Sequence, residues 1–378
     1  MLNRRILRVK AMQALYGYFT ALESLKEVSK NELEKKHALD PAKHDFADKG
    51  LFETRKKLAV RLFSQNYLKE QVETSESVEA DVLENVNDEI QDFQNKLASE
   101  VRVRRTEMLK DTNRIYDLYL KFLQLPIELE HIERLYVEKK KLNRPTPFVN
   151  NVVIEKLKAS EVLEKELRQY HISWQDELDE IRSWYKQEIT QSEPLQDYFR
   201  HQTDASSLIL ELFKKVMFKN ENIVAYLENQ NLHWSENQPI IKSMILKTIK
   251  SMTEGEDFEL AELTKNGQDD FDFFQKLFDG VIKQDQFLDK LIASKTKNWD
   301  VDRIAITDRV ILKLALVEMM VCPSIPMKVS INEAIEISKM YSTPKSKQFI
   351  NGILDVLSNE LSSTGKVRKS GRGLIDNK

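Results

Sequence analysis

Cysteine, glycine and proline are all scarce in this sequence. Its only cysteine is Cys322, so no intramolecular disulfide and no cysteine-based metal site can form, which fits a reducing cytoplasm. Cys322 ends an apolar run with no histidine nearby, and we therefore expect a buried, unreactive thiol. Nine glycines and nine prolines in 378 residues are too few for the many turns of an all-β protein. Long helices rich in Leu, Lys, Glu and Ala are the expected alternative.

Long hydrophobic runs are also absent. No apolar stretch reaches the length of a membrane span, and the basic N-terminus is not followed by the apolar core and cleavage site of a signal peptide. A formal net charge of −3 argues against a general nucleic-acid binder. The distribution of charge is more informative, because both ends of the chain are basic. The first ten residues hold four cations and no acid, namely Arg4, Arg5, Arg8 and Lys10. The tail holds four more before its first acid, Asp376, namely Lys366, Arg368, Lys369 and Arg372.

The N-terminal residues 3–22 have the pattern of a helix. Apolar side chains recur with a period of 3.6 residues, and after the first turns they cover nearly the whole circumference. Such a helix belongs in the core of a domain. The more polar region that follows contains a heptad-like stripe, which predicts a long amphipathic helix in a hairpin or a short coiled coil, formed by Leu83, Val86, Ile90, Phe93 and Leu97.

The middle of the chain suggests a division into segments. We expect an N-terminal helix at 1–25 and a helical insertion at 26–203, with a proline-containing linker near 142–151. Residues 204–265 form a possible repeat unit, because five of their apolar residues recur 65 positions later. These residues are Leu212, Phe213, Val216, Trp234 and Ile241, which match Leu277, Phe278, Val281, Trp299 and Ile306. Similar helices also produce such matches by chance, and unlike backbones in the two segments would exclude a duplication.

The C-terminal third, 266–362, has the clearest helical pattern. We expect helices at 269–292 and 303–321, and a third that begins at a capping box of Ser330 and Glu333. Thr343 is the predicted N-cap of the last helix, with Pro344 at its first position. Residues 363–378 are expected to form a basic, flexible tail.

Five motifs, in this order along the chain, resemble the NusB family of transcription-antitermination proteins. They are RRILR at 4–8, AMQALY at 11–16, DRVILKLA at 308–315, IPMKVSINEAIE at 325–336 and KQFINGIL at 347–354. The resemblance covers about 1–22 and 266–362. It implies an all-α fold of two small helical bundles, enlarged here by a large inserted helical region. It also implies binding of boxA-type single-stranded RNA together with NusE, a small-subunit ribosomal protein, in the antitermination complex of transcribing RNA polymerase, including ribosomal RNA synthesis.

Helix electrostatics favours a bound anion at the N-terminus of the first helix. Positive side chains at a helix N-terminus oppose the helix dipole and cost about 0.3–1 kcal/mol each. A phosphate beside Arg4, Arg5 and Arg8 would reverse this effect, whereas without the family resemblance a solvated basic start is the simpler interpretation. Lys10 belongs to the same cluster. Tyr16 is a further RNA candidate, although an interior tyrosine is the more ordinary role.

Other positions follow from the resemblance alone. The start of the last helix adds Lys345, Lys347 and Phe349 to the RNA surface, where Phe349 either stacks on a base or packs in the core. Lys345 stands where the family often has an acidic residue, and Ile6 where it often has a basic one. The resemblance therefore leaves the preferred RNA sequence open. Asp308, Met327 and Lys328 match positions near the NusE interface, or are ordinary surface residues.

Nothing in the sequence calls for an enzyme. The six histidines have no metal-ligand spacing, and no glycine-rich phosphate loop is present, so we expect no metal and no cofactor. The alternative to an RNA-binding factor is a helical protein-interaction scaffold without RNA activity, and burial of Arg4, Arg5 and Arg8 would favour it. An RNA methyltransferase, such as those that carry a NusB-like domain, is a third and weaker alternative.

Overall fold

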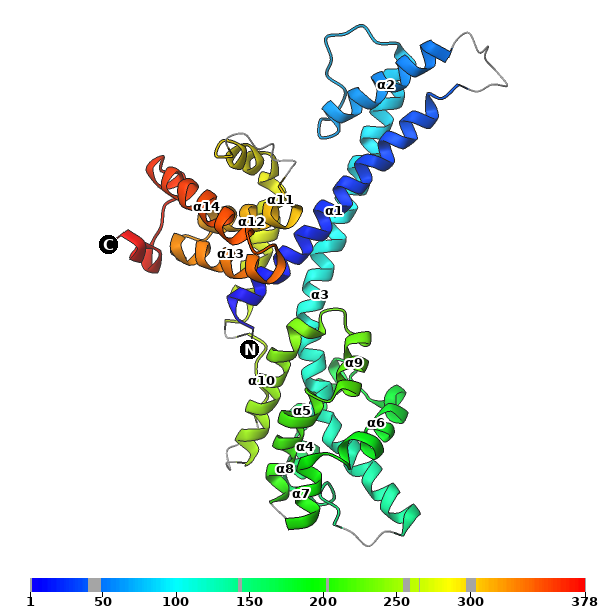
Figure 1. Cartoon of the computed structure of the whole chain (residues 1–378), viewed down its shortest axis with the longest axis vertical. Coiled ribbons are helices and arrows are strands. Elements are labelled where there is room, and N and C mark those ends of the chain that lie inside the picture. Colours follow the sequence, from blue (N-terminus) through cyan, green and yellow to red (C-terminus); the bar gives the residue numbers. More distant parts are fainter. Residues whose placement is uncertain are drawn as a thin grey trace. The chain divides into compact units, whose positions relative to one another are not determined.

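The computed structural model describes residues 2–39, 49–141, 145–201, 204–253, 259–264, 266–296 and 304–377, and most of them lie in helices (Figure 1). No strand occurs among these residues. The predicted all-α class is therefore confirmed. None of the described helices is both long enough and apolar enough to cross a membrane.

The chain forms two compact units. Unit 1 consists of Met1–Asn3 and Lys110–Asp270, and unit 2 of Arg4–Leu109 and Phe271–Lys378. The division falls inside one continuous helix, α3 (Ala80–Lys140), so the segment expected as a single insertion contributes to both units. A helix that passes from one unit to the next has no break in its sequence pattern, which is why the predicted boundaries at 26, 204 and 266 do not coincide with this division.

Among its described residues, unit 1 contains ten short and medium helical elements between α3 and α11. They are α4 (Val152–Ala159), α5 (Glu161–Gln169), the 3₁₀ helix Gln175–Glu177, α6 (Leu178–Trp184), the π-helix Tyr185–Ile189, α7 (Glu193–His201), α8 (Ala205–Leu212), the π-helix Phe213–Met217, α9 (Glu221–Gln230) and α10 (Trp234–Thr253). Asn151, Ser160 and Asn220 cap α4, α5 and α9 through their side chains. The core is aromatic: Phe218 stacks on Trp234 with ring centroids 6.0 Å apart.

Unit 2 combines the two ends of the chain. Its elements are α1 (Arg4–Lys36), α2 (Lys49–Asn66), the first part of α3, α11 (Gln268–Ala293), α12 (Ile306–Val321), α13 (Met327–Tyr341), α14 (Ser346–Ser363) and the 3₁₀ helix Gly371–Asn377. α1 packs against α2 and α12, and α12, α13 and α14 pack against one another (Figure 1). α1 is thus a core element as predicted, but it continues to Lys36, beyond the expected end at residue 25.

The helix pairs of unit 2 are held by specific side chains. Gly280 of α11 lies so close to α12 that an added Cβ would be 2.5 Å from Cγ1 of Val317. Lys313 of α12 is fully buried and forms ion pairs with Asp285 and Asp289 of α11. The predicted long helix in the polar region is confirmed as α3, where Phe93 of the heptad-like stripe is buried beside Phe63 of α2.

The expected repeat is not supported by the backbone. Leu212 ends α8, and Phe213 and Val216 lie in the π-helix that follows it. Their counterparts Leu277, Phe278 and Val281 lie within the continuous helix α11. Trp299 is outside the described residues. The two segments are therefore unlike, and the recurrence reflects similar apolar spacing in different helices.

The helix starts in the C-terminal region differ from the predictions. α13 begins at Met327 after Pro326, so Ser330 is inside the helix and does not form a capping box with Glu333. α14 begins at Ser346 with Lys345 at the N-cap position, two residues after the predicted N-cap, Thr343. In both places the polar side chains make tertiary or loop contacts in place of the expected caps.

The C-terminal tail also differs from the expected flexible segment. Lys369 donates hydrogen bonds to the carbonyl oxygens of Met319 (2.8 Å) and Cys322 (3.0 Å), at the end of α12. Carbonyl groups at a helix C-terminus lack partners within the helix, and a lysine there is stabilising. Val367 is buried. The tail is therefore docked on the bundle, at least as far as these residues.

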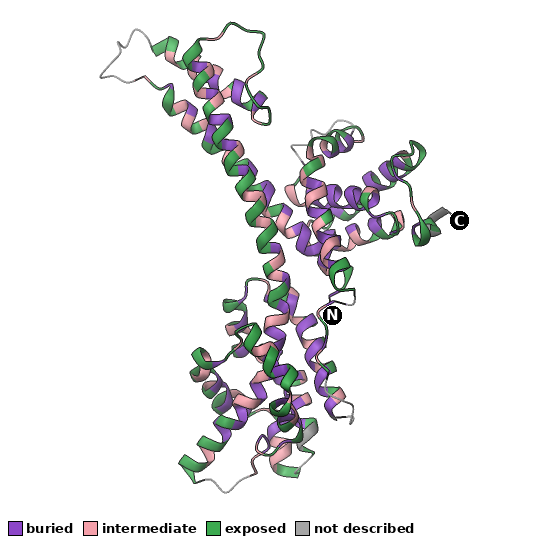
Figure 2. Cartoon of the chain, turned by 180° about the vertical axis from the view of Figure 1, so that it is seen from behind, coloured by how far each residue is buried: buried purple, intermediate pink, exposed green. Residues whose placement is uncertain are grey.

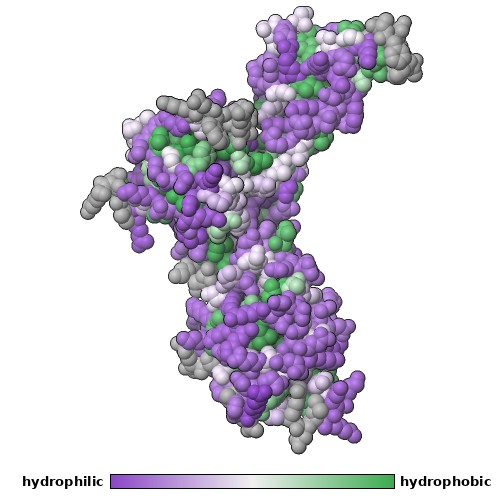
Figure 3. Space-filling view, viewed as in Figure 1, coloured by the Kyte–Doolittle hydropathy of each residue, from purple (hydrophilic) through white to green (hydrophobic). Residues whose placement is uncertain are grey.

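Burial follows helix faces in both units, with buried residues on the inner faces and exposed residues on the outer ones (Figure 2). Hydrophilic residues cover most of the visible surface of each unit, with smaller hydrophobic areas between them (Figure 3). This distribution agrees with a composition of 41% hydrophobic and 31% charged residues.

Candidate functional site

The basic cluster at the start of α1 faces two carboxylates of the C-terminal helices. α1 has no acidic residue in its first turn. Negative charge at this end of the helix is instead supplied by Glu318 of α12 and Glu333 of α13, which pair with Arg8 and Arg5. These tertiary partners offset the unfavourable interaction of the arginines with the helix dipole.

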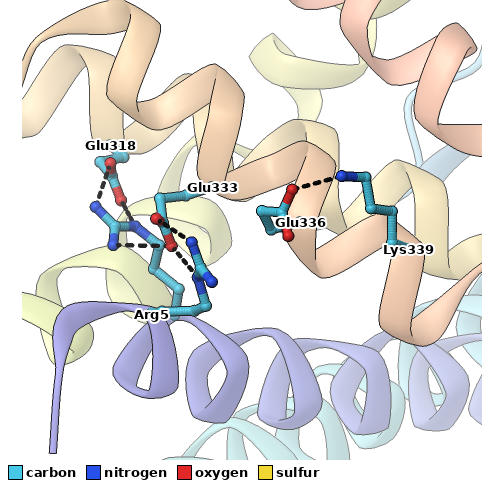
Figure 4. Close-up of polar contacts among 6 residues, drawn as sticks. Arg5, Glu318, Glu333, Glu336 and Lys339 are labelled. Atoms are coloured by element: carbon cyan, nitrogen blue, oxygen red, sulfur yellow. Dashed lines mark hydrogen bonds and ion pairs between the residues drawn. The ribbon is translucent and has the colours of Figure 1, made fainter.

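Arg5 and Glu333 form a two-pronged ion pair at the surface. The Arg5 Nε donates to Oε2 of Glu333 and its Nη2 donates to Oε1, both at 2.9 Å (Figure 4). The Arg5 side chain is 45% exposed, whereas that of Glu333 is 17% exposed. The hydrogen bond from Arg5 and the nearby charge of Arg8 lower the pKa of Glu333. One edge of the Arg5 guanidinium therefore remains accessible while the other is engaged.

Arg8 and Glu318 form the corresponding pair inside the bundle. The Arg8 Nε donates to Oε2 of Glu318 at 2.6 Å and its Nη2 to Oε1 at 2.9 Å. The Ser330 hydroxyl donates to the same carboxylate at 2.6 Å, and Glu333 lies 3.7 Å from Arg8. The Arg8 and Glu318 side chains are only 6% and 2% exposed. A charge pair this deeply buried is stable only when its hydrogen bonds are satisfied, as they are here.

The other predicted residues of α1 lie in different surroundings. Arg4 is exposed, and its guanidinium lies 5.0 Å from the ring centroid of Phe273. Lys10 is buried at 3% exposure, so it does not present its ammonium group to a ligand in this structure. Tyr16 is 44% exposed. Its expected interior role is therefore wrong, and its ring remains a candidate for stacking.

The start of α14 is anchored to α12 by a buried carboxylate. Asp308 accepts hydrogen bonds from the hydroxyl groups of Ser342 (2.5 Å) and Ser346 (2.7 Å). Asp308 is 7% exposed, so this structure gives it a positioning role and does not present it to a partner protein. Lys345 and Lys347 are exposed beside this anchor. Phe349 is half-buried. This exposure does not decide between stacking on a base and packing in the core, the two roles that the sequence left open.

Two contacts fix the direction of α1 relative to α12. Arg8 pairs with Glu318 near the end of α12, and the ring of Phe19 lies 5.7 Å from the guanidinium of Arg309 at its start. The two helices are therefore antiparallel. Asp308, which holds the start of α14, is about 15 Å along α12 from Glu318, at a rise of about 1.5 Å per residue. The two basic groups, at the starts of α1 and α14, thus lie near opposite ends of α12.

The remaining predicted partner residues are at the start of α13. Met327 is half-buried and Lys328 is exposed. They are close in sequence to Ser330 and Glu333, which contact α1 or its partners through their side chains. The structure therefore leaves these two residues accessible but shows no further feature that assigns them a partner.

Glu318 is the residue of this site that the sequence analysis missed. It is the only charged side chain in the run Leu314–Val321, in which every other residue is apolar. Acidic residues are rarely fully buried unless they are paired, so an acid in such a run indicates a buried partner. That partner, Arg8, is 310 positions away in the sequence.

Cys322 lies beside this ion pair. The thiol is buried, and burial together with the charge of Glu318 raises its pKa to about 11. The expectation of an unreactive thiol agrees with this environment, because the thiolate is the reactive form. Within the described part of the chain, no group of three or more His, Cys, Asp or Glu side chains is arranged to hold a metal ion.

Comparison with known proteins identifies the C-terminal region. The model of the NusB family matches residues 240–359. Transcription antitermination protein NusB of Chloroherpeton thalassium is 50% identical over 105 residues, which are 28% of this chain and 50% of that protein. The protein of the same name from Salinibacter ruber is 42% identical over 104 residues, 28% of this chain and 65% of that protein. The chain thus spans from half to just under two thirds of the length of these two relatives.

The chain is also similar to a third relative and to a solved structure. Transcription antitermination protein NusB of Bacillus pumilus is 44% identical over 89 residues, which are 24% of this chain and 68% of the relative. A solved structure of T. maritima NusB is 31% identical and covers 31% of this chain and 80% of that chain, with a TM-score of 0.26.

The family match begins earlier than the motifs suggested. It starts at residue 240, inside α10 of unit 1, whereas the expected resemblance began near 266. α10 is a helix with ordinary apolar spacing and no distinctive motif, which explains why it was not recognised. The N-terminal motifs at 4–16 lie outside the match. The identity across 68% of the Bacillus pumilus protein, with the family match at 240–359, shows that this chain belongs to the NusB family.

Proposed function

We propose that this chain acts in transcription antitermination by binding RNA through the basic starts of α1 and α14. The names of the three relatives describe them as transcription antitermination proteins. In this proposal the ligand is boxA-type single-stranded RNA, bound together with NusE. The complex acts on transcribing RNA polymerase in the cytoplasm, including during ribosomal RNA synthesis, and the chain itself catalyses no reaction.

The observation that carries this proposal is the exposure of cations at both ends of α12. Arg4 and one edge of Arg5 are accessible at the start of α1, and Lys345 and Lys347 are accessible at the start of α14. Arginine and lysine bind phosphate oxygens through charge-assisted hydrogen bonds. An RNA strand that contacts both groups spans a distance comparable to the length of α12, and the exposed ring of Tyr16 on α1 suits stacking on an unpaired base.

Arg8 and Lys10 have a different role in this proposal. Both are buried, so they support the RNA surface and do not contact the RNA directly. The Arg8–Glu318 pair fixes the start of α1 on α12, and Asp308 fixes the start of α14 on the same helix. α12 thus sets the separation of the two cationic groups, because both are anchored to it. Such support of a binding group by a rigid second layer limits the loss of entropy on binding.

The proposal is tested by titrating boxA RNA and a scrambled RNA of equal length onto the full chain, with and without NusE. We expect tighter binding of boxA and a further gain with NusE. Arg4→Gln and Lys347→Gln should each weaken binding about tenfold, because a hydrogen bond to a charged group contributes about 1.5–3 kcal/mol. Lys328→Gln should reduce only the gain from NusE.

The matched control is Lys339→Gln, an exposed lysine of α13 that pairs with Glu336 on its own helix. It should leave RNA affinity unchanged. Equal affinity for boxA and scrambled RNA, in the presence and absence of NusE, would contradict the sequence-specific part of the proposal.

The burial of Arg8 and Lys10 is the specific observation in favour of the second candidate, a helical protein-interaction scaffold. This candidate predicts no RNA binding even with NusE. Under this candidate, unit 1 is the first place to look for a protein-binding surface, because most of it lies outside the family match.

A further inference from the structure

A cavity of about 350 Å³ lies in unit 2 where α12 begins. One side is formed by α1, another by α2 and Tyr67 just after it, and a third by Ile304 and the first turn of α12. Three cationic side chains and one carboxylate line it, namely Lys26, Lys30, Arg309 and Glu23. Its size falls in the range of small-molecule sites, roughly 300–1,000 Å³.

The position of the cations follows from the packing of α1 on α12. Phe19, Lys26 and Lys30 are separated by seven and four residues, so they lie on one side of α1. At Phe19 this side contacts Arg309, in the first turn of α12. α12 begins at Ile306, and beyond that point it no longer covers α1. The two lysines therefore face the cavity at the end of α12.

Each of the two lysines is held by a glutamate of its own helix. Lys26 donates to Glu23 at 3.0 Å and Lys30 to Glu27 at 2.6 Å, each within one turn of α1. Burial lowers the pKa of Lys26, but the hydrogen bond to Glu23 and the contact with Tyr67 outweigh burial and raise it above its ordinary value. Ion pairs of this kind contribute only about 0.3–0.5 kcal/mol, so a phosphate group competes effectively with the glutamates.

The wall next to Lys26 is aromatic and apolar. The Tyr67 ring packs edge-on against the Phe93 ring, with centroids 5.5 Å apart. The Lys26 ammonium lies 4.7 Å from the centroid of the Tyr67 ring. Phe63 and Ile304 are buried beside it. A planar base is the chemical group that matches such a wall next to a cationic cluster, because every base has a face that packs on aromatic and apolar side chains.

We propose that this cavity holds one nucleotide, with its phosphate among Lys26, Lys30 and Arg309 and its base against the Tyr67 wall. Arg309 lies inside the family match at 240–359, whereas the walls from α1 and α2 lie outside it. The site is thus built by joining the matched helices to the additional N-terminal segment. Two sources supply such a ligand: a free mononucleotide, or one nucleotide of the RNA of the proposed function, on which this second case rests.

The test begins with calorimetric titration of AMP and GMP, and of adenosine and guanosine, onto the full chain. We expect the nucleotides to bind at least tenfold more tightly than the nucleosides. Lys30→Gln and Arg309→Gln should each weaken nucleotide binding about tenfold. The control is Lys35→Gln, which removes a similar pair with Glu32 from the same helix outside the cavity and should have no effect. Circular dichroism verifies that each variant is folded, and Lys30 is the safer position because its ion pair is local.

The second arm measures RNA affinity of the same variants. If mononucleotides do not bind but Lys30→Gln weakens RNA binding and Lys35→Gln does not, the nucleotide belongs to the RNA. Equal binding of nucleosides and nucleotides overturns the proposal, as does the absence of mononucleotide binding combined with unchanged RNA affinity in Lys30→Gln. Loss of RNA affinity in Arg4→Gln but not in Lys30→Gln, together with no mononucleotide binding, would leave the proposed function intact and remove only this site. Mononucleotide binding by a chain that binds no RNA would support this site and contradict the proposed function.

Discussion

Arg5 and Arg8 are one helical turn apart on α1, and each forms a two-pronged pair with a glutamate more than 300 residues away. The Arg5–Glu333 pair lies at the surface, whereas the Arg8–Glu318 pair is almost fully buried. Exposed pairs contribute roughly 0–1 kcal/mol to stability, whereas removing one partner of a buried pair costs about 3–5 kcal/mol. The same residue type in one motif therefore has two roles: Arg8 fixes the helix, and Arg5 remains available to a ligand.

The largest effect is expected from Glu318→Gln. This substitution removes the buried carboxylate that is hydrogen-bonded to Arg8 and leaves only Glu333, at 3.7 Å, as a counter-charge, so we expect unit 2 to lose about 3–5 kcal/mol of its free energy of unfolding. Urea unfolding followed by circular dichroism measures it. The control is Glu336→Gln, which removes an exposed pair with Lys339 on α13 and should have a much smaller effect on stability (Figure 4). Equal losses in the two variants would show that burial does not distinguish these pairs.

A smaller effect is expected from acid. Arg5 lowers the pKa of Glu333 below its ordinary value of 4.5, so the unfolded chain takes up a proton at this position before the folded chain does. The stability that this pair contributes is present above about pH 4.5 and is lost as the pH falls through the lowered pKa. Thermal unfolding between pH 7 and pH 3 should therefore show a shallower decline in Glu333→Gln than in the unmodified chain. Parallel curves would contradict this assignment.

Arg5→Gln should change stability by less than about 1 kcal/mol, because the pair that it removes is partly exposed. In the proposed function it should nevertheless weaken RNA binding. Measuring both quantities on one sample separates the two roles. A large loss of stability would place Arg5 with Arg8 as a structural residue.

The smallest effect concerns the thiol of Cys322, which is adjacent to the buried pair. Its pKa of about 11 and its burial predict slow reaction with a thiol reagent at pH 7.5. Glu318→Gln should accelerate this reaction by loosening the end of α12, and Arg5→Gln should not. Similar rates in the two variants would argue that the surface pair and the buried pair are coupled.

Much of the fold was predictable, because helical periodicity depends on local sequence. The expected helices at 269–292 and 303–321 agree closely with α11 and α12, and the apolar N-terminal helix is a core element. The partners of the site were not predictable in this way. Ser330 and Glu333 have the spacing of a capping box, yet both contact residues of other helices, Glu318 of α12 and Arg5 of α1.

The candidate site was only partly predictable for the same reason. A basic motif identifies cations but does not distinguish Arg8, which is buried, from Arg4, which is exposed. Tyr16 shows the opposite error, since an aromatic residue in an apolar helix proved to be exposed. Exposure depends on which helices cover each face of α1, and that information is spread over residues about 300 positions apart.

The central claim is that the exposed cations at the two ends of α12 contact RNA phosphates. Its most direct test is the salt dependence of boxA RNA binding by the unmodified chain and by the triple variant Arg4→Gln/Lys345→Gln/Lys347→Gln. Each phosphate contact with a single strand contributes about 0.7 to the slope of log affinity against log salt concentration. Loss of three contacts should make the slope shallower by about 2. An unchanged slope in the folded variant would contradict the claim.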